Sequence, residues 1–231
     1  METKLLSDHA EDLLEAAELL RNGAVVGMPT ETVYGLAADA RNPEAVRQIF
    51  AAKGRPADNP LIVHIAEMRA LEQVAATVPP LAEKLAERFW PGPLTMILPK
   101  RKEIPEITSG GLDTVGIRMP SHPVARALIQ LSGVPIAAPS ANISGYPSPT
   151  TAQHVMRDMQ GKIAAVVDGG ACSVGVESTV IALEPNGTVR ILRPGFVTKE
   201  MLEEVAPEVT LDPAILHQLQ EGQTVRSPGM K

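Results

Sequence analysis

The sequence is poor in cysteine and in aromatic residues. It contains one cysteine, Cys172, among 231 residues, and aromatic residues make up 3% of the chain. A single cysteine forms neither an internal disulfide nor a cysteine-rich zinc site, which favours a reducing compartment. No apolar run approaches the length of a membrane span, and the N-terminus is charged too early for a signal peptide. We therefore expect a soluble, cytoplasmic protein.

Basic residues are not in excess either. The chain has 21 Lys and Arg against 27 Asp and Glu, a formal net charge of −6. Because Lys and Arg supply most of the non-specific affinity for nucleic acids, this balance argues against a broad basic face that holds RNA or DNA. A local basic pocket is still compatible with it.

Helical and strand-like patterns alternate along most of the chain. Residues 8–23 have apolar side chains at helical spacing, and in residues 42–54 Asn42 and Pro43 form a helix start before Gly54. The last two strand-like segments are neighbours across EPNG, which is typical of a hairpin. Strand-like runs lie at residues 24–28, 61–65, 91–99, 114–119, 134–138, 163–168, 177–183 and 188–193. This order predicts an α/β fold with a mixed sheet.

The regular pattern ends near Val205. We expect one domain over residues 1–205 and a linker-like tail over residues 206–231, with the domain that would follow it absent. The stretch PTETVYGL at residues 29–36 is expected to be a polar loop.

Polar side chains cluster where strand-like runs begin or end. Strand ends are where ligands bind in α/β sheets, and a Lys beside an Arg suits a polyphosphate. On these residues alone it is equally plausible that Lys53 and Arg55 cap a helix C-terminus and face solvent. No GxxxxGK[ST] or GxGxxG motif decides between the two. The residues in question are Thr30, Glu31, Thr32, Lys53, Arg55, Asn59, Ser140, Asn142 and Ser144.

Seven motifs together carry a resemblance to a known family. They are PTETVYGL (29–36), KGRPADNPLIVHI (53–65), FWPGPLT (89–95), IRMPSHP (117–123), APSANISGYPSPT (138–150), VDGG with GVESTV (167–180) and ILRPG (191–195). In this order they resemble the threonylcarbamoyl-AMP synthase family, the YrdC-type enzymes. The resemblance implies an open twisted mixed sheet flanked by helices, with a concave cationic ligand pocket. The terminal SPGMK resembles the start of the interdomain linker in the longer, two-domain branch.

The resemblance also implies an activity. Members of the family join L-threonine, bicarbonate and ATP, release pyrophosphate and form threonylcarbamoyl-AMP. Other proteins pass its acyl group to adenosine 37 of tRNAs that read codons beginning with A. The expected cofactor is Mg²⁺ bound mainly through the ATP phosphates, with no metal ligands from the protein. Direct binding of tRNA is left open.

The family's site residues map onto positions of this sequence. The threonine site falls on Thr32, His64, Arg118, Ala138 and Ser178. The ATP site falls on Lys53, Arg55, Asn59, Thr114, Ser140, Asn142, Ser148 and Arg193, of which Lys53 and Arg55 are the expected catalytic residues.

Each of these assignments has a structural alternative. His64 interrupts an apolar run, where a core histidine is the usual case. Arg118 could pair with Asp113 or Glu177, and Arg193 could be a charge at the pocket rim.

Two other functions are compatible with the same motifs. The first is a YrdC-like domain of the carbamoyltransferase type, which the single cysteine and the N-terminal helix argue against. The second is a non-catalytic RNA-binding module, which the acidic balance makes weaker.

Overall fold

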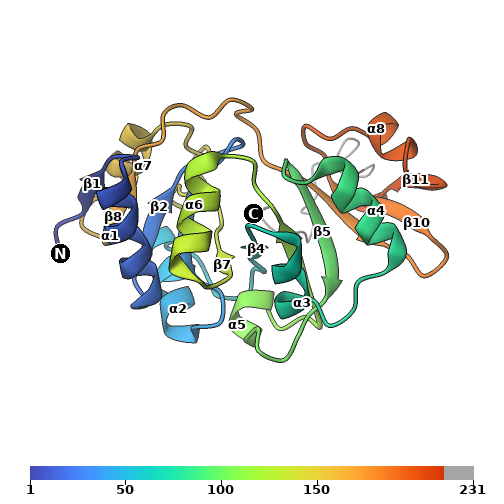
Figure 1. Cartoon of the computed structure of the whole chain (residues 1–231), viewed down its shortest axis with the longest axis horizontal. Coiled ribbons are helices and arrows are strands. Elements are labelled where there is room, and N and C mark those ends of the chain that lie inside the picture. The colour runs from blue at the N-terminus through green and yellow to red at the C-terminus, as the bar shows by residue number, and fades with distance from the viewer. Residues whose placement is uncertain (216–231) are drawn as a thin grey trace.

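A long mixed β-sheet forms the frame of the protein (Figure 1). The structure, a computed structural model, describes residues 1–215, and these contain an 11-stranded sheet. Its strands, in spatial order, are β1 (Lys4–Leu6), β8 (Ala165–Val167), β2 (Val26–Met28), β3 (Gly35–Asp39), β7 (Ile136–Ala137), β4 (Ile62–His64), β6 (Thr114–Arg118), β5 (Leu94–Pro99), β9 (Thr179–Leu183), β10 (Thr188–Arg193) and β11 (Glu208–Leu211). Neighbours pair in both directions: β4 is parallel to β6, and β5 is antiparallel to β6.

Short helices connect the strands and pack on the sheet. They are α1 (Ala10–Arg21), α2 (Pro43–Lys53), α3 (Leu71–Val74), α4 (Pro80–Phe89), α5 (Glu106–Ser109), α6 (Pro123–Ser132), α7 (Ala152–Met159) and α8 (Lys199–Glu203), with a 3₁₀ turn at Met68–Ala70. The α/β class with a mixed, helix-flanked sheet is confirmed. Among residues 1–215, no helix is long and apolar enough to cross a membrane.

The ends of α2 follow from its sequence. The Asn42 side chain accepts hydrogen bonds from the Glu44 and Ala45 backbone N–H groups, at 3.1 and 3.3 Å, and Pro43 occupies the first turn. The helix stops where Gly54 takes the left-handed conformation, with φ 66°. Lys53 is therefore the last helical residue, as the predicted start and stop signals imply.

The half of the sheet that contains β8, β2 and β3 is buried on both faces. Along β8, Ala165 and Val167 pack in one hydrophobic cluster with α1 and α6, whereas Val166 belongs to the cluster on the opposite face. The alternation follows from the two-residue period of a strand. Helices α1 and α6 lie side by side over this half (Figure 1).

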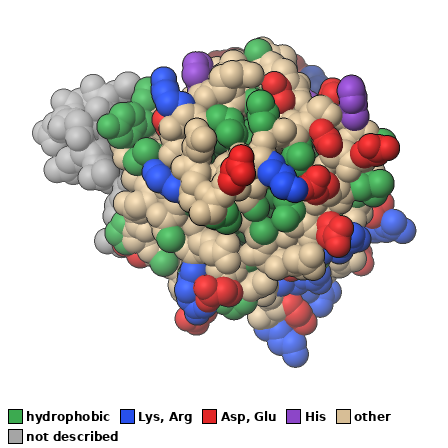
Figure 2. All heavy atoms as spheres, turned by 90° about the vertical axis from the view of Figure 1, so that its left-hand side faces the viewer, with side chains coloured by type: hydrophobic (Ala, Val, Ile, Leu, Met, Phe, Trp, Pro, Cys, Tyr) green, Lys and Arg blue, Asp and Glu red, His purple; other side chains and the backbone are tan. Residues whose placement is uncertain are grey.

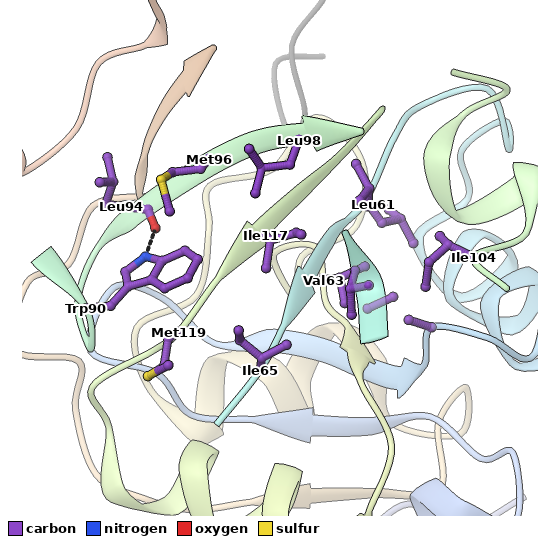
Figure 3. Packing of buried hydrophobic residues seen from close by; sticks show 14 of the residues in the cluster. Leu61, Val63, Ile65, Trp90, Leu94, Met96, Leu98, Ile104, Ile117 and Met119 are labelled. Carbon is purple, nitrogen blue, oxygen red and sulfur yellow. Dashed lines mark hydrogen bonds between the residues drawn. The ribbon is translucent and has the colours of Figure 1, made fainter. Parts of the chain in front are cut away.

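The half that contains β4, β6 and β5 is apolar on one face and polar on the other. Val63, Ile117 and Met96 point into a packed cluster beside Trp90, whose indole N–H donates to the Leu94 carbonyl at 2.7 Å (Figure 3). The residues next to them in each strand therefore point to the other face. That face carries His64, Arg118 and Thr95, and the candidate site lies there.

Two strands near the N-terminus differ from the sequence expectations. Residues 35–39, whose start was assigned to a polar loop, form β3, and residues 4–6 form β1. The hairpin between β9 and β10 is confirmed.

The boundary expected at Val205 is too early. Strand β11 pairs in parallel with β10, and Ala206, Val209 and Ile215 belong to the hydrophobic core. The first ten residues of the expected tail are thus part of the folded domain. Residues 216–231, which include SPGMK, lie outside the described residues.

Replacing Val209 by Ala is expected to lower the free energy of unfolding by about 2 kcal/mol, because two methyl groups leave a packed position. Urea denaturation followed by circular dichroism measures the change. Glu203→Ala, at an exposed position of α8, is the matched control, with an expected change within about 0.5 kcal/mol. Equal stability of the Val209 variant and the wild type would contradict the assignment of β11 to the core.

Candidate functional site

Two adjoining pockets open on the polar face of the sheet. Pocket A has an empty volume of about 510 Å³ and is lined by residues of the loop at 30–35 and of strands β4, β6 and β10. Pocket B, about 690 Å³, lies between the end of α2 and the loop at 140–148. Arg55, Ser140 and Glu177 line both pockets.

Most of the predicted site residues line one or both of these pockets. Pocket A brings together all five residues of the expected threonine set, Thr32, His64, Arg118, Ala138 and Ser178, together with Arg55, Ser140 and Arg193. Pocket B brings together Lys53, Arg55, Ser140, Asn142 and Ser148 of the expected ATP set.

Two residues of the expected ATP set line neither pocket. Asn59 is buried directly before Pro60, which does line pocket A. Thr114 begins β6, four positions before Arg118, and pairs with Pro99 of β5.

Lys53 is buried and bound by the loop that it faces. Its Nζ donates to the Ser140 carbonyl, to the Asn142 carbonyl at 2.8 Å and to Asn142 Oδ1 at 3.5 Å. Burial, followed by the nearby Arg55 guanidinium, lowers the pKa of Lys53 to about 7. The solvent-facing alternative for Lys53 is therefore wrong, since its side chain links α2 to the loop at 140–142.

Within the described residues, two nitrogen atoms of the Arg55 guanidinium have no hydrogen-bond partner. Its Nε and Nη2 are buried and have no hydrogen-bond partner among the described residues, and its Cζ lies 5.4 Å from the centroid of the Phe50 ring. Unpaired buried N–H groups cost free energy unless a ligand or water satisfies them. The guanidinium lines both pockets, so it is suited to an anion that reaches across them.

Arg118 forms a buried ion pair with Glu31. Its Nη2 donates to Glu31, its Nη1 donates to Thr32 Oγ1 at 2.9 Å, and its Nε donates to the Gly92 carbonyl at 3.3 Å. Glu31 in turn accepts from the backbone N–H and the hydroxyl of Ser121, at 2.8 and 2.6 Å. The partner of Arg118 is thus neither Asp113 nor Glu177, the two alternatives that the sequence suggested.

Arg193 is also buried and paired, rather than a rim charge. It forms an ion pair with Glu177, and its Nε donates to the Ser178 carbonyl at 3.0 Å. Its Nη2 donates to Ser178 Oγ at 3.1 Å. The Ser148 hydroxyl donates to the second oxygen of Glu177 at 2.9 Å. Glu177 therefore joins residues of both pockets, and it is the one carboxylate that lines either pocket within the described chain.

His64 lies beside Arg118 on the pocket face. The two residues are register partners on β4 and β6, and His64 Nδ1 lies 3.1 Å from the Ile62 carbonyl. Burial and then the Arg118 charge lower the pKa of His64 to about 3. The imidazole is therefore neutral at neutral pH and suited to hydrogen bonding rather than to charge pairing.

A metal ion has no ready set of ligands from the described residues. No group of three or more His, Cys, Asp or Glu side chains is placed to hold one.

Sequence reasoning did not assign two acidic residues that organise the site. Glu31 and Glu177 orient three of the pocket residues, Arg118, Arg193 and Ser148. Their signal in the sequence is their position inside the PTETVYGL and GVESTV motifs, directly before Thr32 and Ser178, which were assigned to the threonine site.

Fold and site together define an α/β protein with a two-part pocket on one face of its sheet. Four cationic side chains, Lys53, Arg55, Arg118 and Arg193, line the pockets. A family model for Sua5, YciO and YrdC proteins, described as "Telomere recombination", matches residues 18–195. The chain belongs to this family.

Relatives and a solved structure extend the comparison. The chain is 54% identical over 216 residues to the threonylcarbamoyl-AMP synthase of Pyrococcus abyssi and 52% identical over 231 residues to that of Bacillus subtilis. These matches cover 94% and 99% of this chain but 63% and 65% of the relatives, so the chain spans less than two thirds of their length. The crystal structure of P. abyssi Sua5 complexed with L-threonine matches with a TM-score of 0.92 at 50% identity, covering 100% of this chain and 68% of that one.

Replacing Glu31 by Gln is expected to lower the free energy of unfolding by about 3 kcal/mol, because Arg118 is left as a buried charge without its counter-ion. Thermal and urea unfolding measure the loss. Glu44→Gln is the matched control, since the pair of Glu44 with Arg47 is exposed and should contribute at most about 0.5 kcal/mol. Similar small losses in both variants would contradict the assignment of Glu31 as the counter-ion that the buried Arg118 depends on.

Proposed function

We propose that this chain catalyses the synthesis of threonylcarbamoyl-AMP and pyrophosphate from L-threonine, bicarbonate and ATP. The observation that carries the proposal is the arrangement of the pockets: pocket A gathers the five expected threonine residues and shares Arg55 and Ser140 with pocket B, which Lys53 lines. The names of the relatives and the threonine complex of P. abyssi Sua5 support it.

Threonine binds pocket A in this proposal. The contacts of Arg118 with Gly92, Thr32 and Glu31 use only part of its N–H groups, and the rest are available to the threonine carboxylate. The neutral His64 and the Thr32 hydroxyl bind the polar end of the amino acid. Because Glu31 fixes the guanidinium before threonine arrives, little ordering is needed on binding.

The triphosphate of ATP binds in this proposal at the shared wall, which is the boundary of pockets A and B lined by Arg55, Ser140 and Glu177. Arg55 donates its unpaired N–H groups to the phosphates, and Lys53 contributes a positive charge from the end of α2. Lys53 is held by the loop at 140–142 before the reaction, and Arg55 lines the same pocket, so both can stabilise charge that develops on the leaving pyrophosphate.

The chemistry needs no nucleophile from the protein. The threonine amine attacks bicarbonate and water leaves, which gives a carbamate. A carbamate oxygen then attacks the α-phosphorus, the bond between the α-phosphorus and the bridging oxygen breaks, and pyrophosphate departs. Residues of the shared wall, above all Arg55, bring the two anions together.

Mg²⁺ accompanies ATP in this proposal and offsets negative charge on the phosphates. The described residues offer no acidic ligand cluster, so we assign no protein ligand to it.

The product serves tRNA modification in this proposal. Its acyl group is passed by other proteins to adenosine 37 of tRNAs that read codons beginning with A. On the end of the molecule that carries β1, basic and acidic side chains are interspersed (Figure 2), so this face offers no continuous basic patch to a nucleic acid.

The direct test is a pyrophosphate-release assay. We expect release only when ATP, threonine and bicarbonate are all present, and a roughly hundredfold slower rate for Arg55→Ala, because a contact to the leaving phosphates is lost. Arg47→Ala, at an exposed position of α2, is the matched control and should match the wild type. Release that continues without threonine, or at an equal rate in the Arg55 variant, would contradict the proposal.

ATP binding is also expected to take up a proton above pH 7. The pKa of Lys53 in the free protein is about 7, so the amine is mostly neutral at pH 8, whereas a bound triphosphate favours the ammonium and raises the pKa. The affinity of the protein for ATP should therefore fall as the pH rises from about 7 to 9.

Calorimetry at pH 8 in buffers of different ionisation enthalpy measures the proton uptake. It should disappear in Lys53→Met and persist in Lys84→Met, which removes an exposed lysine of α4. Proton uptake that is unchanged in Lys53→Met would show that another group titrates.

A further inference from the structure

The chain has few aromatic rings that a ligand can reach. It contains one Trp, two Tyr and three Phe. Four of these six residues are buried in the hydrophobic core: Tyr34, Phe50, Phe89 and Trp90. The two others, Tyr146 and Phe196, are 62% and 55% exposed.

Of these two residues, Tyr146 lines pocket B. It shares that pocket with Lys53, Arg55 and Ser148, on the loop between β7 and α7. Phe196 lines neither pocket A nor pocket B. An exposed aromatic residue thus lies in the same pocket as the two cations proposed to bind phosphates.

The loop that carries Tyr146 is fixed to the phosphate end of the pocket. The Asn142 side chain donates from Nδ2 to the Tyr146 carbonyl at 2.7 Å and to the Ile143 carbonyl at 2.9 Å. The Tyr146 N–H donates to the Ile143 carbonyl at 3.0 Å, which closes a tight turn.

The same Asn142 accepts from Lys53 Nζ, and the Ser144 N–H donates to the Lys53 carbonyl at 3.0 Å. The spacing between the Lys53 ammonium and the tyrosine backbone is therefore set by hydrogen bonds rather than by a free loop.

We propose that Tyr146 is the residue on which the nucleobase of the bound nucleotide stacks. The inference rests on the proposed nucleotide site in pocket B. A nucleotide needs a cationic end for its phosphates and an apolar surface for its base. Pocket B has both, because Lys53 and Arg55 at the end of α2 face the loop that carries Tyr146. A tyrosine ring that is largely exposed in the free protein provides a surface that a purine can cover.

Stacking has a consequence for specificity. Every base has a π-face, so a ring that stacks binds purines without reading their edges. Tyr146 therefore contributes affinity for a nucleotide over inorganic phosphates, and little discrimination between ATP and GTP.

The test compares ATP with inorganic triphosphate as ligands of the full 231-residue chain, by calorimetry. Tyr146→Ala should weaken ATP binding by about 5- to 100-fold and leave triphosphate binding unchanged, because only ATP has a base. Tyr146→Phe keeps the ring and should bind ATP within about twofold of the wild type. Phe196→Ala, which removes the other exposed aromatic residue, should bind both ligands as the wild type does.

The experiment distinguishes failure of the stacking role of Tyr146 from failure of the proposed nucleotide site. ATP binding that is unchanged in Tyr146→Ala would overturn the stacking role while leaving the nucleotide site in place. Equal weakening of ATP binding and triphosphate binding in Tyr146→Ala would overturn the stacking role, because the change would then come from the loop conformation and not from the loss of the ring. A wild-type protein that binds neither ligand would overturn the nucleotide site and the stacking role together.

Discussion

The buried ammonium of Lys53 is the contact on which the two-part pocket depends. It is the last helical residue of α2, and its Nζ binds carbonyl oxygens of residues 140 and 142. Without such oxygens a buried ammonium is strongly disfavoured, so the loop must stay close to the helix. The same loop supplies Ser140 to both pockets and Tyr146 to pocket B. One desolvated charge thus fixes the relative positions of the groups that would bind a nucleotide.

Two buried carboxylates organise the other cations. Glu31 orients Arg118 from one side of pocket A, and Glu177 orients Arg193 between the pockets. Buried ion pairs of this kind add little net stability, because desolvation offsets most of the attraction. Their effect is on geometry: each guanidinium is held in one orientation before a substrate binds. Arg55 is different, since two of its nitrogen atoms have no partner among residues 1–215, and these are the atoms best able to respond to an anion.

Local signals were enough to predict much of the fold. Helix α2 was predictable because Asn42, Pro43 and Gly54 are its capping residues, and the β9–β10 hairpin because two apolar runs flank EPNG. Strand β3 was missed because GLAAD contains no β-branched residue and gains its stability from pairing with β2 and β7. Strand β11 was missed although it contains Val209 and Thr210, because it is short and depends on pairing with β10 at the edge of the sheet.

The site was predictable from motifs as a set of residues, but not as a set of contacts. The partner of Arg118 is Glu31, which lies 87 positions away in the sequence, and no local pattern connects the two. The face on which His64 lies was equally undecided, because Ile62 and Ile65 on either side of it are both apolar. The register of β4 on β6 decides it by placing His64 beside Arg118.

The boundary that pockets A and B share fits the proposed reaction between two anions. A threonine carbamate and a triphosphate repel each other, and this repulsion is strongest where the new bond must form. Arg55 and Ser140 line both pockets at that point, so charge and hydrogen-bonding groups lie between the ligands. Glu177 lies there too, but Arg193 and Ser148 engage its oxygens, which limits the negative field that it adds. In the proposed reaction the two anions would therefore meet beside Arg55, whose Nε and Nη2 have no hydrogen-bond partner among residues 1–215.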